Sequence, residues 1–338
     1  MMDALVSIVV PCRNERSHIS RCLDSLLGND YPRLEILVVD GLSRDGTREV
    51  LRSYAERYPG IQLLDNPKQI TARALNIGIR QARGEYIMVA GAHASFPADY
   101  ISGLMKYLEQ LDAVGVGGSM VTHSDHTTIG HSIARVLSNR VGVGNSMFRL
   151  GTREPVSVDT VPFGIYHRDV FYRAGLYDER LVRNQDIEFS KRIIRKVGKL
   201  FLVPTILCHY YFKGRYGLLA RSNFQNGLWN IMAVYLTRKF RSISFRHIVP
   251  ALSLLFILIS LILGLFVDGG FLLILLLAGA GYLLLLVITA IRINDSQTSV
   301  PAIVWSFIVL HFSYGFGSLA GLLSLPFRRF SAKRSQRR

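Results

Sequence analysis

Side chains that could bind a ligand follow three predicted strands in the first hundred residues. Pro11, Arg13 and Glu15 come after the first strand, Asp40 ends the second, and Gly91-Ala92-His93 follows the fourth. Carboxylates accept hydrogen bonds, and a neutral imidazole can ligate Mn²⁺, whereas Mg²⁺ prefers oxygen. One polar loop alone is more often a solvated turn. Three at the same edge of one sheet favour a binding site.

A second candidate group is Asn184-Gln185-Asp186-Ile187-Glu188, which begins a predicted helix that continues through Ile194. Asn184 is expected to cap this helix, and acidic residues are common in a first turn for capping and dipole reasons alone. Glu188 is expected to be structural. Asp186 could instead take a proton from a reacting hydroxyl, although a dipole-stabilised carboxylate is a weak base and positioning would have to supply much of the rate.

The elements that must position these residues alternate between strand and helix. Leu5–Pro11 and Leu34–Asp40 are continuous apolar runs, typical of strands buried on both faces. Helices are expected from a Ser17 cap onward, over 47–58 and over 71–82, with further strands at 61–65 and 86–90. This alternation predicts an α/β fold with a mostly parallel, Rossmann-like sheet, whose ligands bind beyond the carboxyl ends of the strands.

The C-terminal third is predicted to be a membrane region. Three apolar runs, at 250–266, 271–291 and 302–325, are each about long enough to cross a bilayer. The net charge is +16, and many of the basic residues lie beside these apolar runs. This placement favours membrane lipids over nucleic acid as the partner. The basic residues before the first run are Arg238, Lys239, Arg241 and Arg246, and those after the last are Arg328, Arg329, Lys333, Arg334, Arg337 and Arg338.

Topology within the membrane stays open, between two and four crossings. Three crossings from a cytoplasmic start would leave the basic tail outside, against the positive-inside tendency. The polar residues near the middle of the third run suit a re-entrant or protein-packed segment, so an even number of crossings is expected. Because the N-terminus lacks the pattern of a signal peptide, we expect a multi-pass protein of the inner (cell) membrane with its first two thirds in the cytoplasm. Cys12, Cys22 and Cys208 have unrelated spacings and are expected to be small buried residues.

Three blocks of sequence resemble one enzyme family. They are VSIVVPCRNE, ILVVDGLSRDGT and ITARALNIGIRQARGEYI, followed by FPADYI and VPFGIYHRDVFYRAGLYDERLVRNQDIEFSKRI. In order and spacing they resemble the family 2 glycosyltransferases with the GT-A fold, over roughly residues 5 to 210. The combination of VDGLSRDGT, AHASFPADY and NQDIEF is most similar to the membrane-associated subgroup that builds bacterial exopolysaccharides such as succinoglycan.

The resemblance implies a nucleotide-sugar donor, and UDP is the expected nucleotide. Glu15 and Asp40 would contact the nucleoside, and Arg73 would approach the base and phosphates, since a guanidinium matches phosphate oxygens. Arg73 could instead be an exposed helix charge. Asp186 matches the family's catalytic base for inverting transfer. Asp45 is expected to brace the Asp40 loop.

At Gly91-Ala92-His93 the chain departs from the family, which has Asp-x-Asp or Asp-Ala-His there. The departing diphosphate still needs its charge neutralised. His93 could hold Mn²⁺ or Mg²⁺ as a metal ligand, or Arg and His side chains could replace the cation. Metal dependence is therefore open.

The stretch before the membrane region resembles the interfacial segment in which membrane-bound synthases carry Gln-x-x-Arg-Trp. Gln225 and Trp229 match that motif and would face the acceptor, but Leu228 stands where the arginine is expected. An amphipathic helix at the membrane interface, anchored by Trp229 and Tyr235, is the alternative.

The sequence thus predicts an inverting hexosyltransferase that moves a sugar to a lipid-linked or growing glycan in cell-surface polysaccharide synthesis. A non-catalytic nucleotide-sugar-binding subunit and a processive synthase are the alternatives. The expected domains are a catalytic domain (1–212), an interfacial segment (213–248), a membrane region (249–325) and a basic cytoplasmic tail (326–338).

Overall fold

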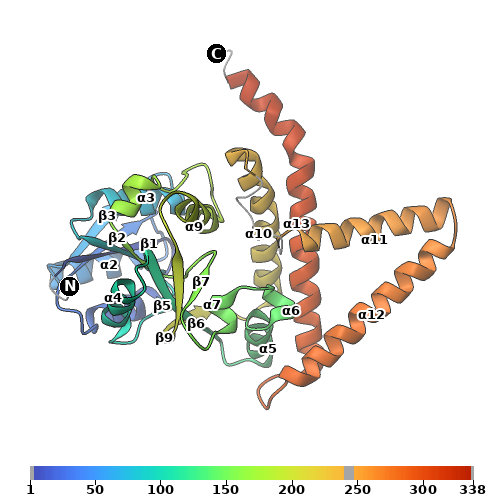
Figure 1. Cartoon of the computed structure of the whole chain (residues 1–338), viewed down its shortest axis with the longest axis horizontal. Coiled ribbons are helices and arrows are strands. Elements are labelled where there is room, and N and C mark those ends of the chain that lie inside the picture. Colours follow the sequence, from blue (N-terminus) through green and yellow to red (C-terminus); the bar gives the residue numbers. More distant parts are fainter. Residues whose placement is uncertain (1–3, 240–246, 336–338) are drawn as a thin grey trace. The chain divides into compact units, whose positions relative to one another are not determined.

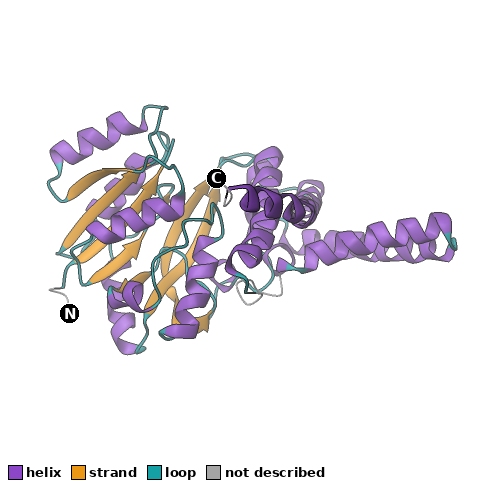
Figure 2. Ribbon diagram, turned by 90° about the horizontal axis from the view of Figure 1, so that it is seen from above, coloured by secondary structure: helices purple, strands orange, loops and turns teal. Residues whose placement is uncertain are grey.

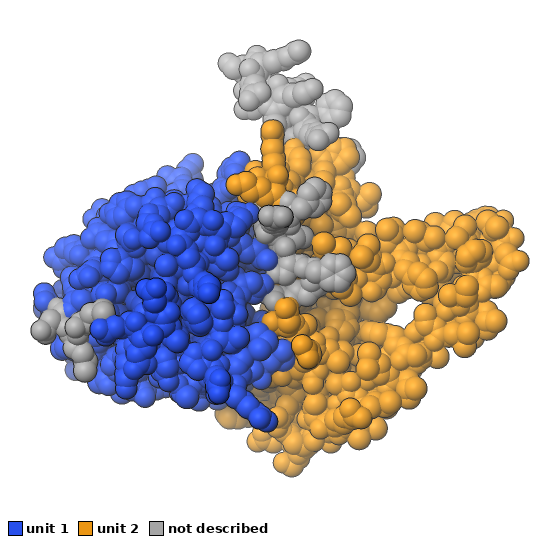
Figure 3. Space-filling model, viewed as in Figure 1, with its two compact units in different colours: residues 1–123, 146–212 blue, residues 124–145, 213–338 orange. Residues whose placement is uncertain are grey.

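The structure is a computed structural model that describes residues 4–239 and 247–335, with side chains up to residue 326. Two compact units divide the chain (Figure 3). Unit 1 consists of residues 1–123 and 146–212, and unit 2 of residues 124–145 and 213–338. Segment 124–145 groups with the C-terminal unit. Each unit is described on its own below.

Unit 1 is built on one mixed sheet in the order β3-β2-β1-β4-β8-β6-β9-β5, with β7 beside β9 (Figure 1). The first four strands are parallel, as predicted. The remainder was not predicted: β8 runs antiparallel to β4 and β6, and β9 antiparallel to β5 and β7. The strands are β1 (Val6–Cys12), β2 (Leu34–Asp40), β3 (Ile61–Asp65), β4 (Tyr86–Val89), β5 (Ala94–Ser95), β6 (Gly115–Ser124), β7 (Val156–Val158), β8 (Ile165–His167) and β9 (Leu200–Phe212).

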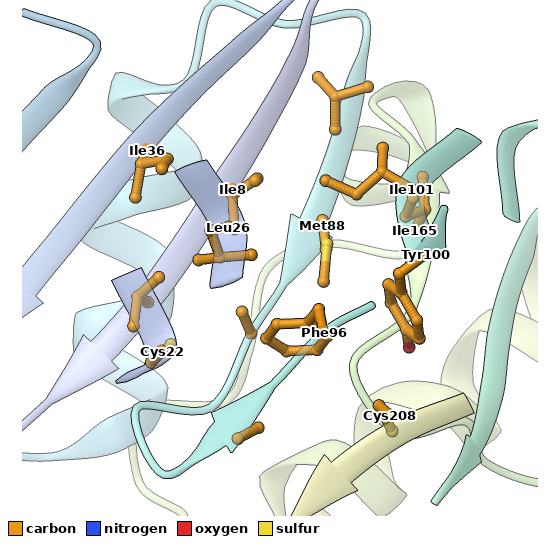
Figure 4. Close-up of a cluster of buried hydrophobic side chains, with 14 of the residues drawn as sticks. Ile8, Cys22, Leu26, Ile36, Met88, Phe96, Tyr100, Ile101, Ile165 and Cys208 are labelled. Carbon is orange, nitrogen blue, oxygen red and sulfur yellow. The ribbon is translucent and has the colours of Figure 1, made fainter. Parts of the chain in front are cut away.

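Helices cover both faces of this sheet (Figure 2), which explains why its central strands are continuous apolar runs. Side chains alternate along β1, so Ile8 enters one core and Val9 the other. The Ile8 core also contains Met88, Phe96 and Tyr100 (Figure 4). It is covered by α1 (Ile19–Leu27), α2 (Thr47–Arg57) and α4 (Tyr100–Gln110), and the other core by α3 (Thr71–Gln81), α8 (Asp169–Arg173) and α9 (Gln185–Lys196).

One predicted helix cap is wrong, and the other occupies the predicted N-cap position without a side-chain cap hydrogen bond. His18 occupies the N-cap of α1, and the Ser17 hydroxyl lies 3.0 Å from His18 Nδ1 instead of binding a backbone amide. Asn184 does precede α9, but in a left-handed conformation with φ of 60° and no side-chain cap hydrogen bond. All three cysteines are buried, as expected, and burial raises the thiol pKa of Cys22 and Cys208 to about 12.

Unit 2 contains three helices that are long and apolar enough to cross a membrane: Val249–Phe266, Gly270–Ile293 and Val300–Pro326. They lie at the predicted positions. Most of the large side chains on the first two are exposed, as lipid-facing residues would be. The helices of this unit are α5 (Thr128–Leu137), α6 (Arg140–Val143), α10 (Tyr216–Thr237), α11 (Val249–Phe266), α12 (Gly270–Ile293) and α13 (Val300–Ser335).

The third apolar run is one continuous helix, α13, so the re-entrant alternative is not what the structure has. It is instead packed within unit 2. His311 lies 2.9 Å from the Tyr282 hydroxyl and 2.9 Å from the carbonyl oxygen of Val141. A Cβ at Gly317 would lie 1.9 Å from the Phe224 carbonyl oxygen, so glycine lets α13 approach α10 closely.

The expected basic clusters fall largely beyond what the structure describes. Arg238 and Lys239 follow α10 and are exposed. Arg241, Arg246, Arg337 and Arg338 lie outside the described residues, and the side chains of Arg328, Arg329, Lys333 and Arg334 are likewise not described. The number of crossings, the orientation and the domain boundaries therefore stay predictions.

Candidate active site

The loop after β1 is held against the loop after β2 by a network centred on Asp45. Its carboxylate accepts hydrogen bonds from the Arg16 amide at 3.2 Å, the Thr47 amide at 3.1 Å and the Thr47 hydroxyl at 2.5 Å. The Glu15 amide in turn donates to the Thr47 hydroxyl oxygen at 2.9 Å. Gly46 has φ of 90°, the left-handed region that favours glycine, which turns the chain into α2. The predicted bracing role of Asp45 matches this geometry.

Asp40 ends β2 fully buried. Its Oδ1 accepts the Ser43 hydroxyl at 2.5 Å, and its Oδ2 accepts the Ser43 amide at 3.1 Å and Arg48 Nη1 at 3.0 Å. Arg48 also pairs with Asp65 at 2.6 Å, so it joins the ends of β2 and β3. In this arrangement Asp40 shapes the loop, and its predicted contact with a nucleoside stays a prediction.

The ends of β1 and β4 bring two predicted site residues together. Glu15 Oε1 lies 3.3 Å from His93 Nδ1, and Glu15 Oε2 lies 3.3 Å from His18 Nδ1. Glu15 and His93 both keep part of their surface in solvent, with side-chain exposures of 24% and 35%. A ligand at this edge of the sheet can therefore reach both side chains.

The aromatic ring of Tyr210, near the end of β9, lies beside the group formed by Glu15 and His93. The His93 and Tyr210 ring centroids are 4.9 Å apart in an edge-on arrangement. Their strands are tied together, because the Tyr211 amide donates to the His93 carbonyl oxygen at 3.0 Å. The guanidinium carbon of Arg149 also lies 5.7 Å from the Tyr210 ring centre. Neither Tyr210 nor Arg149 was predicted.

Gly91, where the family carries an aspartate, lies against an aromatic ring. A Cβ at this position would be 2.7 Å from Cε1 and 3.1 Å from Cζ of Phe163. Phe163 is itself held in an uncommon backbone conformation, with φ of 43°, and its carbonyl oxygen accepts the Tyr100 hydroxyl at 3.1 Å. Its ring packs edge-on against Phe96. The chain therefore lacks room for a side chain where the missing carboxylate would be.

The residues present offer a divalent cation at most one of the predicted ligands. Within the described part of the chain, no group of three or more His, Cys, Asp or Glu side chains could hold a metal ion. His93 is the one predicted ligand, and Phe163 fills the space at Gly91 from which a second protein ligand would come. Protein side chains alone therefore do not form a metal site here.

Asp186 lies in the first turn of α9 and retains solvent-exposed surface. Desolvation by the protein around the carboxylate raises the pKa of Asp186, while the Ile187 amide and the Arg183 guanidinium oppose that rise. A raised pKa makes this carboxylate a stronger base than an ordinary helix-capping aspartate. Glu188 is buried and paired with Arg192 at 2.7 Å, in agreement with its predicted structural role.

The remaining predicted residues are spread along the sheet edge and beyond it. Arg73 pairs with Glu179 at 3.3 Å and is 41% exposed. Arg13 is exposed and its side chain packs over Gly41, and Pro11 lies within β1 opposite Val39. Their predicted contacts with a donor are not tested by this geometry.

Gln225 and Trp229 belong to α10 in unit 2. Apolar side chains are distributed around α10 instead of gathering on one face, unlike the amphipathic helix that was the alternative prediction. The helix packs closely on α13, where a Cβ at Gly227 would lie 2.1 Å from the Tyr314 carbonyl oxygen. The predicted acceptor-facing role of Gln225 and Trp229 stays a prediction.

The sequence profile described as Glycosyl transferase family 2 matches residues 7–175. The chain belongs to this family. It is 28% identical over 248 residues to the Methanococcus voltae dolichyl N-acetyl-alpha-D-glucosaminyl phosphate 3-beta-D-2,3-diacetamido-2,3-dideoxy-beta-D-glucuronosyltransferase, covering 66% of this chain and 76% of that protein. It is 29% identical over 211 residues to the succinoglycan biosynthesis protein ExoA of Rhizobium meliloti, covering 60% and 62% respectively.

Solved structures agree on the fold. The mannosyltransferase PcManGT from Pyrobaculum calidifontis, solved with GDP-Man and Mn²⁺, superposes with a TM-score of 0.61 at 19% identity. The match covers 95% of this chain and 88% of that one. Staphylococcus aureus TarS 1–349 gives a TM-score of 0.50 at 16% identity, covering 94% and 90%. The GT-A-like α/β sheet followed by apolar helices is therefore confirmed, and the chain is a glycosyltransferase.

Proposed function

We propose that this glycosyltransferase moves a sugar from a nucleotide donor, UDP-linked, to a lipid-linked saccharide, with inversion at the anomeric carbon. The observation that carries the proposal is the pairing of Glu15 with His93 at the carboxyl edge of the sheet, in a family 2 chain whose Asp186 is solvent-accessible with a raised pKa. In α/β sheets this edge is where ligands bind.

The proposed chemistry assigns one role to each part of the site. Glu15 accepts hydrogen bonds from the nucleoside. Arg13, in the loop after β1, and Arg73, in the first turn of α3, approach the phosphates. Asp186 takes the proton of the acceptor hydroxyl as its oxygen attacks the anomeric carbon. General base catalysis of this kind contributes about 10²- to 10⁴-fold to a rate.

The lipid-linked acceptor is supported by unit 2. Three helices of membrane-spanning length follow the catalytic unit. The Methanococcus relative is named for a dolichyl phosphate-linked sugar, and the Rhizobium relative for succinoglycan biosynthesis. An enzyme bound to the membrane meets acceptors that are themselves held in the bilayer.

The test is nucleoside diphosphate release by the detergent-purified full chain, supplied with a panel of UDP- and GDP-sugars and a lipid extract of cell membranes. We expect release with one donor that increases when the lipid extract is present. Release that is indifferent to lipid would remove the lipid-linked acceptor. Nucleotide binding without release from any donor would favour a non-catalytic binding subunit, and a long polymeric product would favour a processive synthase.

A further inference from the structure

Gly91, the position at which the resemblance implies an aspartate that contacts the metal or the ribose, has no room for a side chain in this chain. The Phe163 ring occupies the space into which a side chain at Gly91 would project. The charge of a departing diphosphate must nevertheless be balanced in the transition state. The structure places a different source of positive charge beside His93.

That source is Arg149, on the short helix α7 (Met147–Leu150). Its Nη1 donates to the Thr122 hydroxyl at 3.1 Å, and its guanidinium lies over the Phe148 and Tyr210 rings. Across the described residues, no carboxylate pairs with Arg149, and its neighbours Tyr210 and Cys208 are uncharged near neutral pH. Desolvation lowers the pKa of this guanidinium. Holding a cation in such surroundings is costly unless an anion accompanies it.

Contacts within unit 1 connect Arg149 to both ends of the proposed site. Tyr210 neighbours both Arg149 and His93, and His93 faces Glu15 at the proposed nucleoside end. The Arg183 guanidinium in turn has Tyr210 and Asp186 among the groups that act on it electrostatically. A diphosphate beside Tyr210 would thus be near both the proposed nucleoside contact and the proposed base.

From this arrangement we infer that Arg149, with His93 and the Tyr210 hydroxyl, binds the diphosphate of the donor and that transfer requires no divalent cation. The inference rests on the proposed function. As the acceptor oxygen bonds to the anomeric carbon, Asp186 receives the acceptor proton. The bond from that carbon to the phosphate oxygen breaks, and its electron pair stays on the oxygen. Arg149 balances the added negative charge of the leaving nucleoside diphosphate.

Calorimetric binding to the detergent-purified full chain in EDTA tests this, with UDP, GDP, uridine and guanosine as probes. Without metal, we expect either UDP or GDP to bind with much higher affinity than its own nucleoside. Arg149→Met should lower the affinity for that nucleoside diphosphate by about 10- to 100-fold, because charge-assisted hydrogen bonds are lost. The affinity for the nucleoside should stay unchanged. Arg149→Lys should recover part of the loss. Arg52→Met, an exposed arginine on α2, is the matched control and should change neither affinity.

A second variant tests the metal directly. Gly91→Asp combined with Phe163→Ala restores a carboxylate and the space for it, so Mn²⁺ should strengthen diphosphate binding to this double variant but not to the unaltered protein. The inference is overturned if EDTA abolishes binding or turnover by the unaltered protein and Mn²⁺ restores it, or if a folded Arg149→Met binds the diphosphate normally. In both cases the proposed function survives. Failure of UDP and GDP to bind with or without Mn²⁺ would instead overturn the proposed function and this inference with it.

Discussion

The contact between Gly91 and Phe163 makes a quantitative prediction about stability. In Gly91→Ala, the new Cβ would lie 2.7 Å from Phe163 Cε1, closer than real Cβ contacts. The ring cannot move freely, because it packs on Phe96 with centroids 5.6 Å apart and its backbone carbonyl accepts the Tyr100 hydroxyl. Overpacking of this kind costs about 1–3 kcal/mol. One kcal/mol lowers Tm by about 2–4 °C in a domain of roughly this size, so we expect a loss of about 2–12 °C.

The assay is thermal unfolding of the full chain in detergent for Gly91→Ala, Phe163→Ala and the double variant. Phe163 is only partly buried, so Phe163→Ala alone should cost less than the ~3–5 kcal/mol of a fully buried phenylalanine. In its background, Gly91→Ala should add almost nothing, because the obstructing ring is gone and coupled neighbours are not additive. Gly60→Ala is the matched control, since a Cβ there would lie 3.8 Å from its nearest neighbour, the Leu34 carbonyl oxygen. Equal losses from Gly91→Ala in both backgrounds would refute the steric argument.

Two further predictions concern titrating groups in unit 1. Glu35 is buried, yet hydrogen bonds from Ser7 and Arg83 outweigh that desolvation and lower its pKa, so Glu35→Gln should cost about 1.5–3 kcal/mol at neutral pH. This stabilisation is present above the unfolded pKa of about 4.3 and is lost as pH falls through the lower folded pKa. The difference in Tm between the unaltered protein and Glu35→Gln should therefore become smaller in acid. A Tm difference that does not change with pH would contradict the lowered pKa of Glu35. The pKa of Asp186 is raised by desolvation from the surrounding protein, so kcat should fall as pH drops through a value above the ordinary aspartate pKa of about 3.9. A fall in kcat centred at or below that value would count against the assignment of Asp186 as the base.

The parallel half of the sheet could be predicted because its strands are buried on both faces. Val6, Ile8 and Val10 point to one core and Val9 to the other, so a continuous apolar run was the expected signal. The antiparallel half could not be predicted in the same way. Ile165–His167 is too short for a reliable period, and its place between β4 and β6 depends on contacts far apart in sequence.

The same distinction applies to the site. Glu15, Asp40 and His93 could be found because they directly follow buried strands, and sheet geometry then brings Glu15 to His93. Phe163 and Arg149 gave no such signal. Phe163 meets Gly91 from a segment 72 positions away, and Arg149 reaches Tyr210 through a four-residue helix that has no amphipathic period to read. The aspartate missing at 91 was visible in the sequence, but the ring that fills its place was not.

Asp186 is the proposed base of a nucleotide-dependent sugar transfer, and the decisive variant for that role is Asp186→Asn. The measurement is turnover together with nucleoside diphosphate affinity, on the full chain with the donor identified by the panel. Asparagine keeps the shape but cannot take a proton, so kcat should fall by about 10²- to 10⁴-fold with unchanged affinity. Normal transfer by Asp186→Asn would contradict the account.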